Sequence, residues 1–504
     1  MTVRGERLDM RGSCLAVLLL AACAGTQAPN PPVPDDGGAR ITILHINDVY
    51  EIAPVEGGKA GGLARVATLL QRLKAQDPST RMFLGGDFLS PSAIGTARVD
   101  GERLAGRQMV AVLNGAGLDL ATFGNHEFDL SLSELAKRVA ESRFAYVSTN
   151  VTDSLGAPLF GVPRHLVLRL TDARGRPARI GVVGATIDQV RKPNLRYEPP
   201  IPSLRREIAL IRDSVDAIVA LTHLSLAGDM QLADSVADLD LILGGHEHEN
   251  WAVRRGARFT PIVKADANVR SVAIVHLDVR AGTRPGVDWR IVTITDSVPE
   301  DPAVSALVTH WTQLAYNAFR QDGLHPDRLV ATIPSALDAR EAIIRNGENG
   351  FTRLLAAAFH AAAPDAQVAL VNSGSVRLDD LLPPGPVTEY DVIRILPFGG
   401  KAVVVEMTGA LLKRALEQGD ANRGLGGFLV NDGAVRTAQG WRIGDTPLDT
   451  LRRYTVVTPD FLVSGGEQNM SWLSERNPEL RPLRTLSDVR LILIDELRRR
   501  FPPR

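Results

Sequence analysis

The chain has 504 residues, of which 44% are hydrophobic and 23% are charged. This length is too great for one hydrophobic core, so two or three domains are expected, and the composition is that of an ordinary soluble, globular protein. The formal net charge of −1 gives no support for a surface that binds nucleic acid.

The amino end has the features of an export signal. Its positive region contains three arginines, Arg4, Arg7 and Arg11. The apolar run that follows, residues 14–20, is too short to span a bilayer. We therefore expect a lipoprotein signal peptide over residues 1–22, which implies that the protein is exported.

The chain has two cysteines, Cys14 and Cys23, so the body of the protein has neither a disulfide nor a thiolate metal ligand. The sequence Leu20-Ala-Ala-Cys23 resembles the bacterial lipobox, whose cysteine is lipidated. An ordinary secretory signal cleaved after Ala22 is the alternative. We expect a lipid anchor on Cys23 at the periplasmic side of the cell envelope, in the outer membrane, and a flexible tether over residues 23–39 that is rich in Pro, Gly and Asp.

Short β-type runs recur through residues 40–296, and residues 61–74 place apolar side chains at helical spacing. The runs are continuously apolar, which is typical of strands whose sheet is covered on both faces. The predicted strands are residues 40–47, 81–84, 118–123, 178–184, 217–221, 239–243, 261–266 and 271–279.

Five of these runs stop at a glycine or another small residue and then present Asp, Asn or His. In open α/β sheets the ligand site lies beyond the carboxyl ends of the strands. We therefore expect the polar side chains after these strands to converge on one rim of the sheet. They are Asp48, Asp87, Asn125, His223, His246 and His248.

The densest group of such side chains is Asn125-His-Glu-Phe-Asp129. Asn125 can offer a carbonyl oxygen to a divalent cation, and His126 can meet a substrate as an acid or a hydrogen-bond donor. Asp129 lies three residues further on, close enough to hold His126 in one orientation. These residue types at this spacing indicate a site for a metal-bound phosphate.

A helical connector is expected over residues 297–328, because residues 304–319 have helical periodicity. A second domain is expected over residues 329–504. Its predicted elements are a helix over 350–363 opened by Asn349, strands over 368–371, 402–407 and 453–458, and a helix over 408–418.

Carboxylates, imidazoles and an amide oxygen suit Mn, Zn, Co or Fe better than Mg or Ca alone. Two such ions about 3.5–4 Å apart can share one carboxylate, clamp a phosphate and activate a water. The sequence therefore predicts two divalent metal ions as cofactors.

The motifs Gly86-Asp87, Gly124-Asn-His-Glu127 and Gly245-His-Glu-His248 resemble those of the calcineurin-like metallophosphoesterases. The downstream half resembles the carboxyl-terminal domain of bacterial 5′-nucleotidases, through Asn372-Ser-Gly-Ser-Val-Arg377 and Phe461-Leu-Val-Ser-Gly-Gly466. The resemblance implies a four-layer α/β/β/α sandwich followed by a second α/β substrate-binding domain.

The resemblance also implies residue roles. Asp87 would bridge the two metals, Asp48 and His248 would bind the first, and Asn125, His223 and His246 would bind the second. His126, held by Asp129, would stabilise the phosphoryl oxygens or the leaving group. The substrate-binding residues would be Phe398 and Phe461 around the base, Arg377 at an anionic group of the substrate, Glu467 after the paired glycines, and Arg340 and Arg345, which match the family's arginines loosely.

The sequence departs from that pattern at three places. Gly400 follows Phe398-Gly399 where many members carry an asparagine, and Glu467 stands where an aspartate is common. Tyr50 replaces the histidine of the Asp-x-His pattern that begins at Asp48. Tyr50 is then either a metal ligand through its phenolate or a residue that lines the pocket.

The function expected from this resemblance is hydrolysis of nucleotides by an exported, monomeric two-metal phosphoester hydrolase of the 5′-nucleotidase type. Alternatives within the same fold are a 2′,3′-cyclic nucleotide phosphodiesterase, a nucleotide-sugar hydrolase and a sulfur-ester hydrolase. A different class is a lipoprotein that captures nucleotides or metal without catalysis. The retained pair His126 and Asp129 argues against capture alone, because capture needs no acid at the leaving group.

Overall fold

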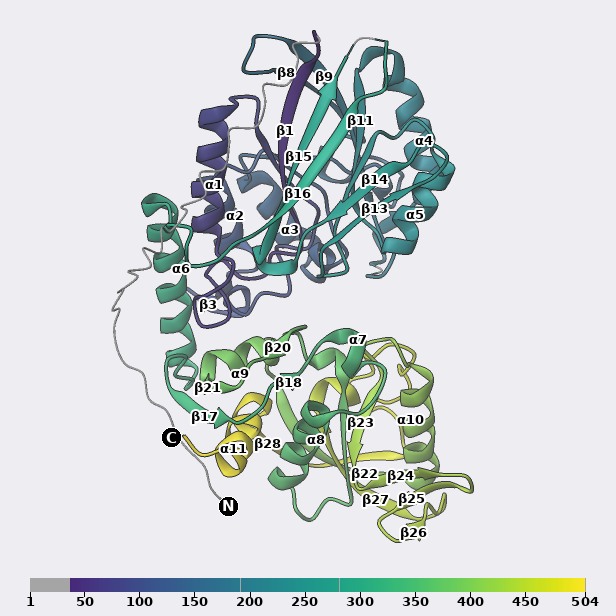
Figure 1. Ribbon diagram of the computed structural model, residues 1–504. Helices are drawn as coiled ribbons and strands as arrows, with labels where there is room; N and C mark the ends of the chain where they lie inside the picture. The colour runs from purple at the N-terminus through teal and green to yellow at the C-terminus, as the bar shows by residue number, and fades with distance from the viewer. Residues whose placement is uncertain (1–36, 191, 281, 504) are drawn as a thin grey trace, which may run out of the picture. The chain divides into compact units, whose positions relative to one another are not determined.

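The computed structural model describes residues 37–190, 192–280 and 282–503 (Figure 1). The expected signal segment, Cys23 and most of the expected tether lie outside the described residues. Among the helices of the described part of the chain, none combines the length and the apolar character needed to cross a membrane.

The first of two six-stranded sheets has the order β16-β15-β1-β2-β5-β6. Strands β1, β2, β5 and β6 are parallel to one another. At one edge β15 pairs antiparallel with β1, and β16 pairs antiparallel with β15. In that order the strands are β16 (Gly286–Thr293), β15 (Ser271–Val279), β1 (Ala39–Ile46), β2 (Arg81–Leu84), β5 (Leu120–Ala121) and β6 (Ala145–Tyr146).

The second sheet has the order β13-β14-β12-β11-β9-β8. Its four inner strands are parallel, and β13 and β8 are antiparallel edges. In that order the strands are β13 (Trp251–Arg255), β14 (Thr260–Lys264), β12 (Leu241–Gly244), β11 (Ala217–His223), β9 (Pro177–Thr186) and β8 (His165–Thr171).

Alternation along the strands sends side chains to two different cores. In β1, Ile41 and Ile43 pack between the two sheets with residues such as Val219 of β11. Leu44 and Ile46 turn the other way, into a core shared with α1 and α2. Each sheet is therefore covered on both faces, as the continuously apolar strands require.

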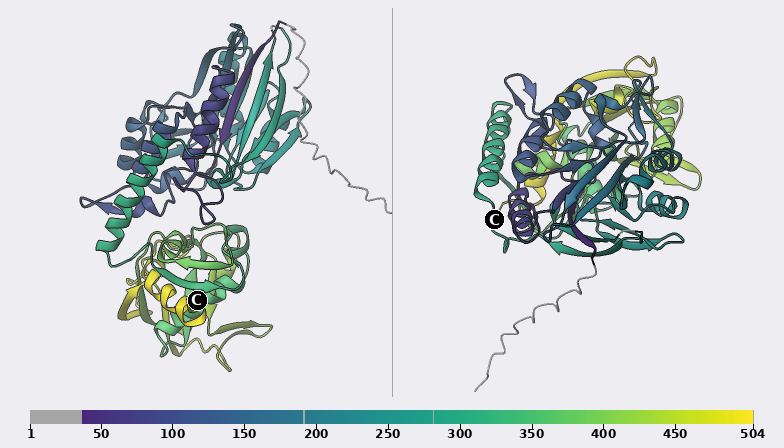
Figure 2. Two further views of the ribbon diagram at one scale, coloured as in Figure 1. Left: turned by 60° about the vertical axis from the view of Figure 1, so that its left-hand side comes forward. Right: turned by 90° about the horizontal axis from the view of Figure 1, so that it is seen from above.

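Helices complete a four-layer α/β/β/α arrangement, with α1 and α2 on one side of the strands and α4 and α5 on the other (Figure 1 and the right-hand view of Figure 2). The predicted α/β class with a second domain is thereby confirmed. The helices are α1 (Leu63–Gln76), α2 (Arg107–Ala116), α3 (Leu132–Glu141), α4 (Pro200–Ile211) and α5 (Leu226–Ser235).

Helix α6 (Pro302–Gln321) lies in the expected connector. Its start follows from its sequence, because the Asp301 carboxylate accepts a hydrogen bond from the Val304 amide at 2.8 Å and Pro302 occupies the first turn. Trp311 and Phe319 are buried in the core that also contains α1 and α2.

The second domain is built on a mixed sheet of order β23-β19-β27-β22-β28, with α8 and α11 on one face and α10 on the other. The strands are β23 (Leu429–Asp432), β19 (Val368–Asn372), β27 (Arg453–Pro459), β22 (Lys401–Thr408) and β28 (Leu480–Asp488). The helices are α8 (Gly350–Ala362), α9 (Glu389–Ile395), α10 (Gly409–Ala421) and α11 (Val489–Arg500).

Two predicted elements show how well local sequence determined the boundaries. Asn349 caps α8, since its side chain accepts from the Thr352 amide while Thr352 accepts from the Asn349 amide. The strand predicted over 118–123 is shorter, because only Leu120–Ala121 forms a ladder before the chain turns into the short helix η2 (His126–Asp129).

Candidate metal centre and substrate cleft

Two aspartates form the floor of the site, at the carboxyl ends of neighbouring parallel strands. Asp48 follows β1 and Asp87 follows β2, and both side chains are buried. Asp48 accepts hydrogen bonds from the Asn47 side chain at 2.8 Å and the His246 amide at 2.9 Å. Asp87 accepts one from the His126 amide at 2.8 Å.

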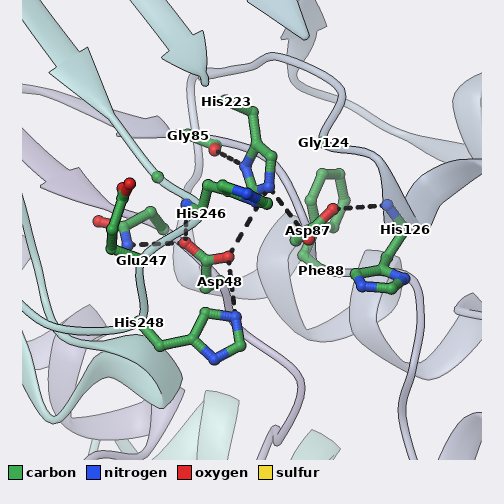
Figure 3. Close-up of polar contacts among 12 residues, drawn as sticks. Asp48, Gly85, Asp87, Phe88, Gly124, His126, His223, His246, Glu247 and His248 are labelled. Carbon is green, nitrogen blue, oxygen red and sulfur yellow. Dashed lines mark hydrogen bonds and ion pairs between the residues drawn. The ribbon is translucent and has the colours of Figure 1, made fainter. Parts of the chain in front are cut away.

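Three histidines surround these carboxylates (Figure 3). His223, at the end of β11, places Nε2 at 3.1 Å from Asp87 Oδ2 and 3.9 Å from Asp48 Oδ1. His248 places Nε2 at 3.4 Å from Asp48 Oδ1. The His246 ring lies 5.3 Å from the His223 ring, centroid to centroid. The strand-end residues predicted from the sequence are therefore brought together here.

Tyr50 reaches into the same group. Its hydroxyl lies 3.0 Å from His248 Nε2 and 3.3 Å from a carboxylate oxygen of both Asp48 and Asp87. Burial raises the pKa of Tyr50 well above its usual value, and the charges of Asp87 and Asp48 raise it further. The phenol oxygen thus stands among three of the groups proposed as metal ligands from the sequence.

This donor set fits divalent metal ions. Metal–ligand bonds of about 2.1 Å put neighbouring ligand atoms about 3.0 Å apart in an octahedral shell and about 3.4 Å apart in a tetrahedral one. The spacings of 3.1 Å and 3.4 Å given above agree with those values. In the described part of the chain, the buried atoms His223 Nε2 and Asn125 Oδ1 have no hydrogen-bond partner, which is costly unless a cation satisfies them.

The histidines differ in the group that contacts the ring nitrogen turned away from the two carboxylates. His223 Nδ1 lies 2.7 Å from the carbonyl oxygen of Gly85. Burial lowers the pKa of His223, but the charges of Asp87 and Asp48 outweigh this and raise it to about 9. Burial and the charge of His223 lower the pKa of His246 to about 3. His248 Nδ1 contacts the carboxylate of Asp379, which belongs to the second domain.

His126 lies beside Asp87, away from the other histidines (Figure 3). Its Nδ1 is 2.8 Å from Asp129 Oδ2, and Ser90 donates a second hydrogen bond to that oxygen at 3.1 Å. Burial lowers the pKa of His126, but the charges of Asp129 and Asp87 outweigh this and raise it overall. The pair is suited to hold a proton at the edge of the site.

A cleft of about 2190 Å³, lined by residues of both domains, opens in front of this cluster. It is larger than the usual volume of a small-molecule pocket, roughly 300–1,000 Å³. The predicted site residues that line it are Asp87, Asn125, His126, Asp129, His246, His248, Arg340, Arg345, Arg377, Phe398, Phe461 and Glu467.

The two aromatic residues of the cleft leave large parts of their rings open to solvent. Phe398, in the turn between α9 and β22, is 51% exposed, and Phe461, which follows β27, is 48% exposed. The Arg377 guanidinium carbon lies 5.5 Å from the centre of the Phe398 ring. Core phenylalanines would not keep this exposure, so the rings are available to a ligand.

The remaining predicted substrate residues are occupied by internal partners. Arg340 pairs with Asp338 at 2.7 Å, and Arg345 pairs with Glu341. Glu467 accepts a hydrogen bond from the Asn372 side chain at 2.6 Å. A ligand anion would have to share these arginines with their carboxylate partners.

Comparison with known proteins places this geometry in a family. Residues 41–250 match the family model of the calcineurin-like phosphoesterases, and residues 330–475 match that of the 5′-nucleotidase C-terminal domain. The chain belongs to the 5′-nucleotidase family. It is therefore a metal-dependent phosphoester hydrolase of the 5′-nucleotidase type.

The similarity to known relatives covers most of this chain. The 5′-nucleotidase of Bos taurus is 25% identical over 85% of this chain and 83% of its own. Protein UshA of Yersinia enterocolitica is 24% identical over 85% of this chain and 86% of its own. The crystal structure of a 5′-nucleotidase precursor from Thermus thermophilus has the same fold, with a TM-score of 0.73 and 22% identity over 92% and 97% of the two chains.

Three further residues support the site, and the sequence alone predicted no role for them. They are Glu127, Lys264 and Asp379. Glu127 belongs to the Gly-Asn-His-Glu motif, which could have pointed to it. Nothing in the local sequence points to Lys264 or Asp379, because their partners are distant along the chain.

Glu127 ties the Asp87 loop to the loop that follows β5. Its carboxylate accepts hydrogen bonds from the amides of Asp87 at 2.8 Å, Phe88 at 2.8 Å, Leu89 at 3.0 Å and Gly124 at 2.6 Å. The close approach requires glycine at 124, since a Cβ there would lie 2.0 Å from Asp87 Oδ1. Burial and the charge of Asp87 raise the pKa of Glu127 to about 7, against the effect of these hydrogen bonds.

Lys264, at the end of β14, is fully buried behind the two histidine loops. Its ammonium group donates to the carbonyl oxygens of Leu224 at 2.8 Å and Gly245 at 2.7 Å, and it pairs with Asp229 at 2.9 Å and with Glu247. Leu224 follows His223 and Gly245 precedes His246. One buried cation therefore joins the backbone positions of both histidines.

Replacing Glu127 by Gln should destabilise the protein by about 1–3 kcal/mol, because the amide nitrogen cannot accept from the backbone donors it would face. The free energy of unfolding from urea titration measures this. The matched control is Glu102→Gln, whose side chain is 82% exposed, with a change expected within about 0.5 kcal/mol. Equal stability of the Glu127→Gln variant and the unsubstituted protein would show that the four hydrogen bonds do not support the loop.

Proposed function

We propose that the chain removes phosphate from 5′-nucleotides with the help of two divalent metal ions. The observation that carries this proposal is that one cleft is lined both by Asp87, His246 and His248 of the carboxylate–histidine cluster and by two exposed aromatic rings. The cluster suits a phosphate held by metals, and the rings suit a nucleobase. Export with a lipid anchor at Cys23 remains part of the proposal and is supported by sequence alone.

In this proposal Asp87 would be shared by the two ions. Asp48, His248 and Tyr50 would hold the first, and Asn125, His223 and His246 would hold the second. The burial of Asp48, Asp87, Asn125 and His223 supports the assignment. In the described part of the chain, His223 Nε2 and Asn125 Oδ1 also make no hydrogen bond. Bound ions would supply Lewis-acid activation of the phosphoryl group and of a water nucleophile at neutral pH. Manganese, zinc, cobalt and iron all suit these donors.

The chain's own residues then orient the substrate and handle protons. His126, fixed through Nδ1 by Asp129, directs Nε2 at the cleft and, when protonated, donates to a phosphoryl or leaving-group oxygen. Phe398 and Phe461 stack on the base, and Arg377 meets an anionic or polar group of the nucleotide with its guanidinium fork.

Two variants of the proposal use the same residues. A 2′,3′-cyclic nucleotide or a nucleotide sugar would present its phosphoester to the same cluster and its base to the same rings. Capture without catalysis would need the cluster and the rings but not a proton donor. The 2.8 Å contact between His126 and Asp129 therefore favours catalysis.

We expect the purified protein reconstituted with Mn²⁺ or Co²⁺ to release phosphate from AMP or UMP, and chelation to abolish the release. The screen should also include 2′,3′-cAMP, ADP and UDP-glucose. The matched variant is His126→Ala, which should lower kcat by about 10²–10⁴-fold and leave the metal content unchanged. Binding of AMP without turnover of any of these substrates would favour capture instead.

Substitution of Phe398 or Phe461 by Ala should raise KM for AMP about 5- to 150-fold, since each ring stacked on a base contributes roughly 1–3 kcal/mol. KM for ribose 5-phosphate, which has no base, should change little. Phe259→Ala is the control, because that ring is 68% exposed but lies on strand-connecting residues that do not line the cleft. Equal losses with both substrates would refute the aromatic clamp.

Tyr50 should give an optical signal if its oxygen binds the first metal. Protein loaded with Fe³⁺ should show a visible phenolate-to-metal charge-transfer band, since a cation favours the deprotonated form of a coordinating group. The band should be absent in Tyr50→Phe. It should remain in the control Tyr197→Phe, because the Tyr197 hydroxyl of the unsubstituted protein donates to the Val190 carbonyl oxygen at 2.8 Å. A band that survives Tyr50→Phe would leave Tyr50 only a pocket-lining role.

A further inference from the structure

His248 is the histidine of the cluster whose orientation depends on a group outside the first domain. Its Nδ1 contacts Asp379 Oδ2, while its Nε2 lies 3.4 Å from Asp48 Oδ1 and 3.0 Å from the Tyr50 hydroxyl. By contrast, His223 Nδ1 is held by the Gly85 carbonyl and His126 Nδ1 by Asp129, both within the first domain.

Asp379 lies in a loop of the second domain that connects β19 to β20 (Leu381–Leu382). Two residues before it is Arg377, which lies over the Phe398 ring. Asp379 has a left-handed backbone with φ of 43°, an uncommon conformation for a residue with a Cβ. Its carboxylate also accepts from the Glu341 amide, so the side chain is fixed from its own domain before it meets His248.

A carboxylate or carbonyl on the second nitrogen is the usual way in which a metal-binding histidine is oriented. It fixes the tautomer, so that the other nitrogen presents its lone pair to the ion, and it increases the basicity of the ring. With Nδ1–H donated to Asp379, Nε2 of His248 is directed at the position shared with Asp48 and Tyr50. His248 lies between β12 and β13, outside any helix or strand, and its backbone is left-handed with φ of 62°.

We infer that Asp379 is a positioning residue for the first metal ion, so that this metal site is completed by the second domain. The inference rests on the proposed role of His248 as a metal ligand. The second ion has no such dependence, because the loops of its histidines are joined inside the first domain by Lys264. Loss of Asp379 should therefore weaken the binding of the first ion and leave the binding of the second unchanged.

The neighbouring residue provides a matched control. Asp380 also joins the two domains, through Arg270 at 2.9 Å, and its side chain is buried to a similar degree, at 14% exposed against 18% for Asp379. Among the described residues, the Asp380 carboxylate pairs with Arg270 and accepts from the Leu381 amide, and it makes no hydrogen bond or ion pair with a metal-ligand candidate. An effect that came only from loosening the domains should be the same for both aspartates.

The experiment titrates the metal-free full chain with Mn²⁺ by calorimetry and follows bound Mn²⁺ by electron paramagnetic resonance. Asp379→Ala should lower the affinity for one of the two ions about 10- to 100-fold, which is the usual effect of removing a partner that orients a metal-binding histidine. Asp379→Asn should weaken it less, because the amide oxygen still accepts the Nδ1 hydrogen bond. Asp380→Ala should keep both affinities within about threefold of the unsubstituted protein.

Unchanged affinities in Asp379→Ala, or an equal loss in Asp380→Ala, would overturn the inference. Two ions bound without hydrolysis of any nucleotide would overturn the proposed function, while the comparison of the two aspartates would still decide the role of Asp379. A chain that binds no Mn²⁺ would overturn both. If Asp379→Ala does not fold, Asp379→Asn gives the same comparison with a smaller expected change.

Discussion

Two like charges lie buried at the ends of neighbouring strands, and the rest of the first domain compensates for them. Asp48 and Asp87 are essentially inaccessible to water. Ionised carboxylates in such a position are unfavourable unless hydrogen bonds and opposite charges surround them. Backbone amides, Asn47 and the rings of His223 and His248 supply part of that compensation. Among the described residues, Asn125 Oδ1 and His223 Nε2 make no hydrogen bond, which points to a cation for the rest.

The residues of the cluster require an unusual backbone conformation. Asp48, Asp87, His246 and His248 all have positive φ, at 54°, 56°, 88° and 62°. Left-handed backbone at residues other than glycine costs free energy and persists only where the surroundings enforce it. Glu127 enforces it at Asp87 through four amide hydrogen bonds, and Lys264 enforces it near His246 through the Gly245 carbonyl. Charged groups that never touch a substrate are therefore part of the site.

The strand-end part of the cluster could be predicted from the sequence, because a buried parallel strand followed by glycine and a polar residue is a local pattern. Asp87 follows from it directly, after Gly85 and Gly86, and Asp48 follows from its place just after an apolar strand, although Asn47 stands where a glycine would. Asp379 could not be predicted this way, since it is 131 residues from His248 in the numbering and its loop resembles any polar loop. Lys264 has the same difficulty, because it ends an apolar strand and its partners come from three other segments. Local patterns determine which residues end a strand, whereas tertiary contacts determine which carboxylate supports which histidine.

The paired arginines give the cleft a further property. Arg340 and Arg345 are bound to Asp338 and Glu341, and Arg377 lies 3.6 Å from the same Glu341. A phosphate that draws an arginine away must compensate the carboxylate it leaves, so little net affinity comes from these charges. The exposed rings carry no such cost. If Phe398 and Phe461 hold the base as proposed, selection for a nucleotide over another phosphoester should therefore depend on the base more than on these arginines.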